Sequence, residues 1–494
     1  MSDKNFPMAI SDEQQKNFLE KLNSALSMVD DIVSKNYITQ LSQFDVVPFP
    51  LNDKEAENDL NSNLRLFKIT EMAYEKNEFA SHKFATAFNA LSSIKCAVFL
   101  IIKSDGQSTS FYMGIRSNDE KHTTTSIKDT LKRAVQGQFP GIKIGDDYLN
   151  PDVHKLISSI EADGICSVSC VANSRNSDNR INDAFVQGLE KFALSMQGEK
   201  YTAVILANNT SREQITKLRK DYESIYTQLS TFASRQISNA SNSSVTFSEA
   251  ISHTDTQGTN EARSTTNTTG HSFSATEGKN ESKSSKSFMG AIGALTVILA
   301  PLMPAYTSGT SSSSSESNSS SESTSNTYGA NKSTSDGQTH TTGNQSGTSQ
   351  TITFTQNDKN ISGILEKIDT QLKRIREFES LGMWECAAYF MSDSVYTAEI
   401  AASSYKALMS GENSGVETSA INSWSISSRD SHVKSQTPQV AKYVTNFTHP
   451  VFIYPSSKGD IPVTPSSFVS GNELALHMGL PRHSVRGLPV IEHA

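Results

Sequence analysis

Cys96-Ala97-Val98-Phe99-Leu100-Ile101-Ile102 is an uninterrupted apolar run, which is the pattern of a strand buried within a sheet. Asp105-Gly106 follows it, and this dipeptide favours a tight hairpin turn. The next run, Ser110-Phe111-Tyr112-Met113-Gly114-Ile115, supplies a second strand. We therefore predict a β-hairpin over these residues.

Outward from this hairpin, strand patterns alternate with helical patterns. Strands are expected at 164–172, 201–207 and 384–391, and helices at 127–135, 182–196 and 395–409. This alternation indicates an α/β (α+β) body in two parts, 91–210 and 383–450. The N-terminal region, 1–90, is expected to be helical, with one helix over 54–90 that places Leu60, Leu64 and Phe67 on one face.

Two segments that flank a long insertion, 211–238 and 357–382, carry apolar residues at heptad spacing. The spacing predicts a long antiparallel helical hairpin of two coiled-coil segments, with the Ser/Thr-rich residues 239–356 at its far end. The outgoing seam is Ile215, Leu218, Tyr222, Ile225, Leu229 and Phe232, and the returning seam is Ile361, Ile364, Ile368, Leu372, Ile375 and Phe378.

The insertion 239–356 has two arms rich in Ser, Thr, Asn and Gly around an apolar centre at 288–306. The arms fit a disordered loop or a β-ribbon. Two glycines and two prolines in the centre favour a re-entrant tip over a straight transmembrane span. An apolar tip is expected to contact a membrane or neighbouring subunits. The residues expected to make this contact are Phe288, Met289, Ile292, Leu295, Val297, Ile298, Leu299, Leu302 and Met303.

Composition argues against several classes of function. The chain has 494 residues and a net charge of −8, which disfavours direct nucleic-acid contact through phosphate neutralisation. The N-terminus has no export signal, so a cytoplasmic location, with possible membrane association, is expected. The four cysteines form no C-x-x-C pair, which favours buried thiols over a metal site or a disulfide.

No catalytic, metal-binding or cofactor-binding residue is predicted. The sequence contains no G-x-x-x-x-G-K-[ST] phosphate-binding loop, so we expect no ATP binding by this chain alone. Glu473 and His477 lie four residues apart on an expected helix, with His483 nearby. Metal ligation is one interpretation of this spacing, and a solvated helix face is the preferred one.

The C-terminal segment 470–491 resembles the segment that leads into the motor domain of HerA-type ATPases. These are ring-forming translocases related to FtsK and to the conjugation ATPases of type IV secretion. The resemblance is carried by a motor-linker motif: Leu480, Pro481, Arg482, Ser484, Val485, Gly487, Leu488 and Pro489. It implies that 451–494 is a linker toward a motor domain, and the order of elements is similar to the ferredoxin-like N-terminal domains of the conjugation ATPases.

The resemblance implies a non-catalytic N-terminal assembly or docking module of a HerA-like ring translocase that moves DNA or protein. A homo-oligomeric ring, a separate motor ATPase and a membrane are the expected partners, and ATP and Mg²⁺ are expected only for the motor. The alternative is a stand-alone pore-forming or adhesive protein with a Ser/Thr-rich β-stem.

Overall fold

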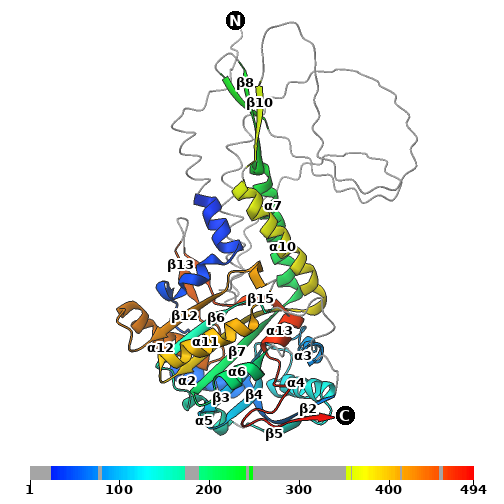
Figure 1. The fold of residues 1–494 in the computed structure, drawn as a ribbon, viewed down its shortest axis with the longest axis vertical. Helices are drawn as coiled ribbons and strands as arrows, with labels where there is room; N and C mark the ends of the chain where they lie inside the picture. The colour runs from blue at the N-terminus through cyan, green and yellow to red at the C-terminus, as the bar shows by residue number, and fades with distance from the viewer. Residues whose placement is uncertain are drawn as a thin grey trace, which may run out of the picture.

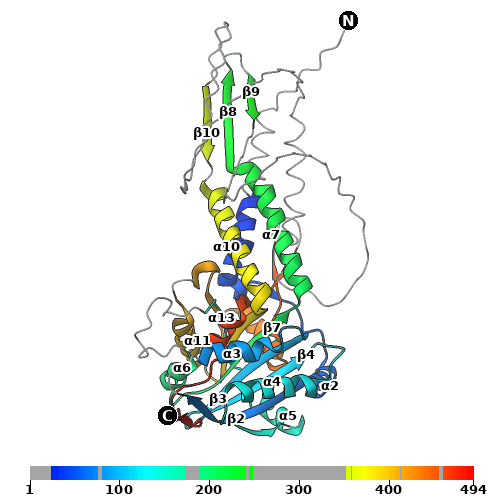
Figure 2. The same cartoon turned by 90° about the vertical axis from the view of Figure 1, so that its right-hand side faces the viewer.

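The computed structural model describes residues 24–75, 80–148, 150–172, 188–240, 244–248, 352–357, 359–411, 414–455 and 460–493. These residues form a body built on one large sheet, from which two long helices extend (Figures 1 and 2). The protein is a mixed α/β structure, as the sequence predicts.

The body contains a ten-stranded sheet with the main order β12-β6-β11-β7-β3-β4-β2-β16, in which β15 also pairs with β11 and β5 with β2. Every pairing in it is antiparallel except that of β16 with β2. Its strands are β2 (Leu64–Glu75), β3 (Cys96–Asp105), β4 (Thr109–Ser117), β5 (Lys143–Asp147), β6 (Gly164–Ser169), β7 (Lys200–Thr210), β11 (Met383–Ser392), β12 (Ala420–Ser425), β15 (Ser467–Ser470) and β16 (Val490–His493).

One face of the sheet is covered by helices that bury the side chains of alternate strand residues. Val98, Leu100 and Ile102 of β3 point into this core, because successive side chains of a strand lie on opposite faces. The covering helices are α3 (Ala80–Asn89), α4 (Thr124–Gln138), α6 (Leu189–Ser195), α11 (Val395–Met409) and α13 (Gly471–His477).

The opposite face, toward which Phe99 and Ile101 point, packs against a second core. Its elements are a helix over residues 24–33, η1 (Asn36–Gln43), α2 (Asp53–Asn63), α5 (Asn150–Ser158), α12 (Ser431–Thr445) and a small sheet of β1 (Asp45–Val46), β13 (Phe452–Tyr454) and β14 (Ile461–Val463). The short η3 (Ser414–Val416) lies beside α10.

Two long helices, α7 (Arg212–Ala233) and α10 (Lys359–Leu381), lie side by side above the body (Figures 1 and 2). Arg219 pairs with Glu379 at 2.6 Å near their lower ends. Beyond their upper ends, β8 (Ser234–Ala240) pairs with both β9 (Ser244–Ser248) and β10 (Ile352–Asn357). We call α7, α10 and these three strands the leg.

The apolar seams predicted from heptad spacing are buried wherever their side chains are described, except that Leu372 is only partly buried. The seam residues of α7 and α10 lie in the same core as the helix over residues 24–33. This helix of the body therefore packs against the base of the leg. Among the described residues, no helix combines the length and apolarity needed to cross a bilayer.

The predicted helix over 54–90 is wrong. The chain forms α2, then the long strand β2, then α3. Leu64 and Leu66 of β2 lie in the second core, which also contains the seams of the leg. Phe67 and Ile69 lie in the core on the opposite face, beneath α3 and α4. A spacing of three or four apolar residues is compatible with one helix face, but here sheet pairing with β4 and β5 decides the conformation.

The predicted hairpin is confirmed as β3 and β4, with Gly106 at a φ of 88° in the turn. Strands are also confirmed near 164–172, 201–207 and 384–391, and helices near 127–135 and 395–409. Of the helix expected over 182–196, residues 189–195 are helical as α6 and residues up to 187 lie outside the described part. The short strands β5, β12, β13, β14, β15 and β16 were not predicted.

Candidate functional site

The motor-linker segment, 480–490, lies against the end of the body opposite the leg. The Tyr74 hydroxyl donates a hydrogen bond to the Leu480 carbonyl over 2.9 Å. The Met72 N–H donates to the Pro489 carbonyl over 3.0 Å. The chain then continues as β16, a parallel neighbour of β2 with Val490 opposite Met72. The segment therefore leads into the edge of the sheet and is held there by backbone hydrogen bonds.

A tight turn stands at the centre of this segment. Val485 and Leu488 exchange two backbone hydrogen bonds, of 3.1 and 3.0 Å, around Arg486 and Gly487. Gly487 has a φ of 97°, and a Cβ added there would lie 2.3 Å from the Thr109 carbonyl oxygen. The Thr109 N–H donates to the Arg486 carbonyl over 2.8 Å. Only glycine fits where this turn meets the β3–β4 hairpin.

The eight motif residues divide between the core and the surface. Leu480, Pro481, Val485 and Leu488 are buried, Arg482 is half-buried, and Ser484, Gly487 and Pro489 are exposed. The buried members are part of, or lie beside, the helix-covered core. The structure thus brings the motif together as one docked unit, in which four apolar residues anchor the chain and Ser484 and Pro489 face solvent.

His483 joins this unit to α6. The Glu190 carboxylate accepts hydrogen bonds from the His483 N–H over 3.1 Å and contacts Nδ1 of its ring at 2.9 Å. The Glu190 side chain is only 5 % exposed, whereas that of His483 is 68 % exposed. A buried carboxylate requires such partners, so this contact fixes the segment beside α6.

The nine apolar residues predicted for the tip, Phe288 to Met303, and both arms from 249 to 351 lie outside the described residues. Membrane or subunit contact by Phe288, Met289, Ile292, Leu295, Val297, Ile298, Leu299, Leu302 and Met303 stays a prediction.

The helix that carries Glu473 and His477 is α13, and the expectation of a solvated face is wrong. His477 is buried, with Nδ1 2.7 Å from the Tyr405 hydroxyl and Nε2 accepting the Ala172 N–H over 3.3 Å. Burial lowers the pKa of His477 to about 4, so the ring is neutral near pH 7. No cluster with metal-ligand character occurs among the described residues.

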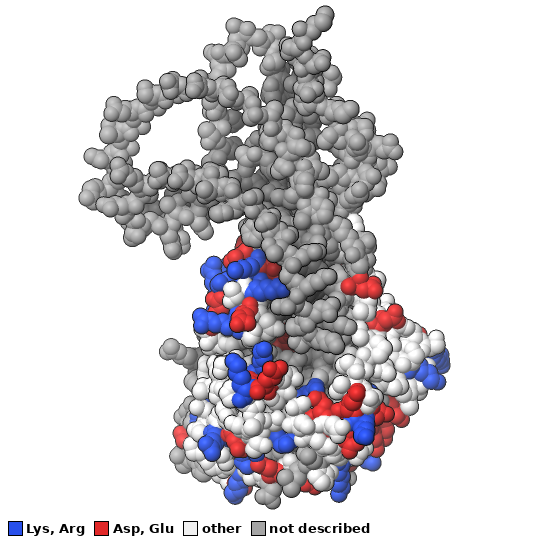
Figure 3. All heavy atoms as spheres, turned by 180° about the vertical axis from the view of Figure 1, so that it is seen from behind, with Lys and Arg blue, Asp and Glu red and all other residues white. Residues whose placement is uncertain are grey.

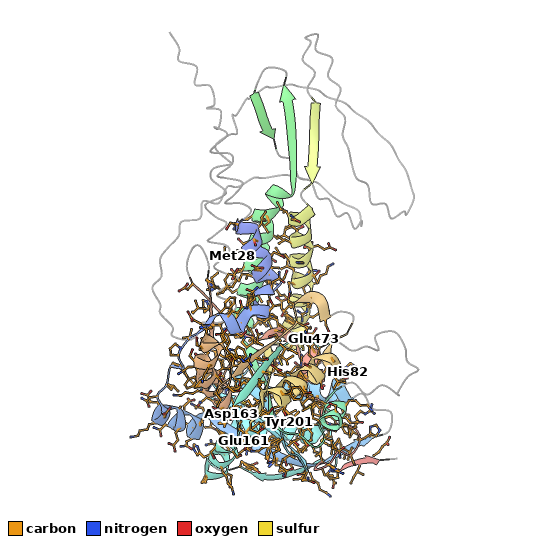
Figure 4. The ribbon with its side chains drawn as sticks, turned by 60° about the vertical axis from the view of Figure 1, so that its left-hand side comes forward. Met28, His82, Glu161, Asp163, Tyr201 and Glu473 are labelled. Carbon is orange, nitrogen blue, oxygen red and sulfur yellow. The ribbon has the colours of Figure 1, made fainter. Side chains whose placement is uncertain are left out.

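Glu473 belongs to a charged cluster where the leg meets the body. Figure 4 shows Glu473 just below the two helices of the leg. Its carboxylate accepts from Arg374 of α10 over 2.9 Å and also from the Ser470 N–H over 2.8 Å, which caps α13. Arg374 Nη2 further donates to the Phe468 carbonyl over 2.7 Å. One arginine thus ties the leg to β15 and α13.

Glu417 and Lys35 complete this cluster. Lys35 Nζ lies 2.9 Å from the Glu417 carboxylate and 3.0 Å from the Ser466 carbonyl, and Arg374 Nη1 lies 3.6 Å from Glu417. Both side chains of the Lys35–Glu417 pair are 1 % exposed. Sequence reasoning did not predict this cluster, although Arg374 stands beside the apolar seam residue Ile375.

Glu385 of β11 lies in the same region and is also buried. Burial raises the pKa of its carboxyl to about 7, and the charge of Lys35 partly opposes this effect. The neighbouring His449 donates from Nε2 to the Glu385 carbonyl over 3.0 Å, and burial lowers the pKa of His449 to about 4. The sequence signal for Glu385 was a lone acidic residue in an apolar strand.

We predict that Glu385→Gln changes the pH dependence of stability. The pKa of Glu385 is about 7 in the folded chain and near 4.5 in the unfolded chain, so the protonated carboxyl favours folding most below pH 4.5. This contribution to stability is lost as the pH rises from 4.5 to about 7. The free energy of unfolding of the variant minus that of the parent should therefore be about 2–3 kcal/mol larger at pH 8 than at pH 5. Denaturant unfolding at both pH values measures this difference.

Glu377→Gln is the matched control, because Glu377 is exposed on α10. Its effect should be the same at both pH values. An identical effect of Glu385→Gln at pH 5 and pH 8 would show that Glu385 ionises normally.

All four cysteines are free and buried, as predicted. Burial raises the pKa of Cys96, Cys166 and Cys170 to about 12, so these thiols are protonated near pH 7. They therefore have no character of nucleophiles or metal ligands.

A small cavity of about 140 Å³ opens beside the motor-linker motif. It lies between the β3–β4 turn, the end of α6 and residues 484–486. The docked motif, this cavity and the buried cluster at the base of the leg are the candidate functional features of the described chain. Comparison of the chain with protein-family models, with curated proteins and with solved structures finds no match.

Proposed function

We propose that the body consists of two ferredoxin-like units that share one sheet. The first unit is β2-α3-β3-β4-α4-β5 and the second is β6-α6-β7-β11-α11-β12. In both, the fourth strand pairs with the first, the first with the third, and the third with the second. This βαββαβ order supports the assignment, and the second strands, β3 and β7, join the units.

In this arrangement the leg is an insertion between the second and third strands of the second unit, where the first unit has only its short turn. The leg then acts as an antiparallel helical hairpin that carries the Ser/Thr-rich insertion away from the body. The register of β8 with β10, which places Ser234 opposite Asn357 directly above α7 and α10, supports this interpretation.

We further propose that the chain is a non-catalytic assembly or docking module of a HerA-like ring translocase. The observation that carries this proposal is the docked motor-linker motif, which four buried apolar residues anchor in the body while other members face solvent opposite the leg. A subunit with a leg at one end and a docking segment at the other has separate surfaces for assembly and for a motor.

The surface supports a role through protein contacts. Acidic and basic side chains are interspersed over the face seen in Figure 3. Nucleic-acid binding relies on clustered cations that neutralise successive phosphates. A motor partner, and not this face of the body, is the proposed site of any DNA contact.

We predict that the docking end contacts a P-loop ATPase in the cell. A photo-crosslinking amino acid at His483, which is largely exposed, should form an adduct with a partner that contains a phosphate-binding loop. The same amino acid at Lys121, an exposed residue at the leg end of β4, should not form it. Mass spectrometry of the adducts identifies the partner, and adducts only with proteins that lack a P-loop contradict the proposal.

The sheet of β8, β9 and β10 favours a second candidate, a pore-forming or adhesive protein whose Ser/Thr arms build a β-stem. Dye release from liposomes by the purified chain, together with a detergent-stable oligomer, would support this candidate over the translocase module.

A further inference from the structure

The cavity beside the motor-linker motif has one charged wall and one apolar wall. Arg486 is the only charged residue among those that line it. With the Gln197 amide oriented so that its oxygen faces the guanidinium, Nε and Nη1 of Arg486 donate to that oxygen over 2.9 and 3.2 Å. No carboxylate of the described residues forms an ion pair with Arg486. The guanidinium therefore retains donors that can bind an anion at the cavity.

The apolar wall is formed by Ala193, Leu194 and Val485. Leu194 is 46 % exposed, so this wall offers aliphatic surface to a ligand from solvent. The other large hydrophobic residues that are exposed in the described chain are Tyr396, Ile426 and Ile491.

These exposed residues lie at one end of the body. Tyr396 follows the end of β11, Ile426 follows the end of β12, and Ile491 is in β16. Strand pairing places these positions with Lys200 and Asp105, at the end of the sheet opposite the leg. Figure 4 shows Tyr201 and Asp163 at this same end. The cavity is thus at the end of the body where apolar side chains reach solvent.

The hairpin turn that closes the cavity has little hydrogen-bonding capacity left for a ligand. The Asp105 carboxylate accepts the N–H groups of Gln107 and Ser108 over 2.8 and 2.7 Å. The Gly106 N–H donates to Ser104, and the Thr109 N–H donates to the Arg486 carbonyl. With these groups occupied, recognition of charge at this site depends on the Arg486 side chain.

We propose that this cavity binds an acidic, aliphatic segment of a partner protein. A carboxylate of the partner pairs with the Arg486 guanidinium, which suits bidentate binding, and an adjacent aliphatic side chain packs on Leu194 and Val485. A single cation beside an apolar wall fits such a segment better than a polyphosphate, which requires several donors. This proposal concerns only the peptide segment that the cavity binds and does not require the partner to be a motor. Its test is therefore independent of the translocase proposal.

The test uses a displayed library of random 12-residue peptides, selected on the full chain. Selection should enrich peptides with Asp or Glu next to Leu, Ile or Val. A synthetic peptide of the selected sequence should then bind Arg486→Glu at least tenfold more weakly than the parent, and replacing its acidic residue with Lys should restore binding to Arg486→Glu. Leu194→Ser, a change at a half-exposed position, should also weaken binding while leaving the melting temperature unchanged.

Lys191→Glu is the matched control, because Lys191 is an exposed cation on α6 that does not line the cavity. It should leave the affinity within twofold of the parent. Enrichment of peptides without acidic residues, equal binding to the parent and to Arg486→Glu, or equal weakening by Lys191→Glu and Arg486→Glu would each overturn the proposal.

Discussion

Replacing both Ile225 and Leu229 with Asp is expected to open the leg while the sheet of the body stays folded. Both side chains are completely buried in the core between α7, α10 and the body. Burial of each aliphatic side chain contributes roughly 1.5–3 kcal/mol, and a carboxylate in the same place adds a desolvation cost. These losses are large against the total stability of about 5–15 kcal/mol that is usual for a domain.

Limited proteolysis with mass spectrometry measures this opening. New cleavage sites should occur within α7 and α10, whereas the β3–β4 hairpin and β7 should keep their protection. Lys220→Asp with Thr227→Asp is the matched control, since both residues are exposed on α7 and the double variant introduces the same two carboxylates. Identical cleavage of the parent and the seam variant would show that the two helices do not depend on this seam.

The seam was predictable because heptad spacing is a local property of the sequence. Residues that occur every three or four positions share one face wherever the segment is helical, and this spacing runs through the whole of α7 and α10. The central hairpin was predictable for a similar reason, because Asp105-Gly106 and its flanking apolar runs lie within one short segment.

The remaining features depend on contacts between distant parts of the sequence. Lys35, Arg374, Glu417 and Glu473 are brought together by the tertiary fold from distant positions in the sequence, and no local pattern connects them. His477 is buried because α13 packs beside Tyr405 of α11. β2 was assigned to a helix because its apolar spacing fits either structure until its neighbours β4 and β5 are known.

Glu417→Leu is expected to cost about 3–5 kcal/mol of stability, because it removes the carboxylate that pairs with the buried Lys35 ammonium. The backbone of Lys35 is left-handed, with a φ of 55°. Its Nζ lies 4.0 Å from the centre of the Phe468 ring. Burial lowers the pKa of Lys35, while Glu417 raises it. Removal of Glu417 therefore favours loss of the Lys35 proton or admission of water, and both disturb the base of the leg.

The double variant Lys35→Met/Glu417→Leu separates the cost of an unpaired charge from the value of the pair. Two apolar side chains of similar size need no desolvation, so the double variant should recover most of the stability lost in Glu417→Leu. Lys367→Met is the matched control, because Lys367 lies on α10, which also carries Arg374, and its pair with Asp30 at 2.7 Å is partly exposed. Its loss should cost about 0–1 kcal/mol.

Denaturant unfolding at pH 7 gives the free energy of each variant, and hydrogen exchange of α10 reports whether the leg loosens. If Glu417→Leu costs no more than Lys367→Met, water reaches the cluster and the pair is not buried in solution. If the double variant is as unstable as Glu417→Leu, the loss comes from Arg374, which also faces Glu417, and not from Lys35. Recovery in the double variant together with faster exchange in α10 would instead mean that the buried charges orient the leg more than they stabilise the fold.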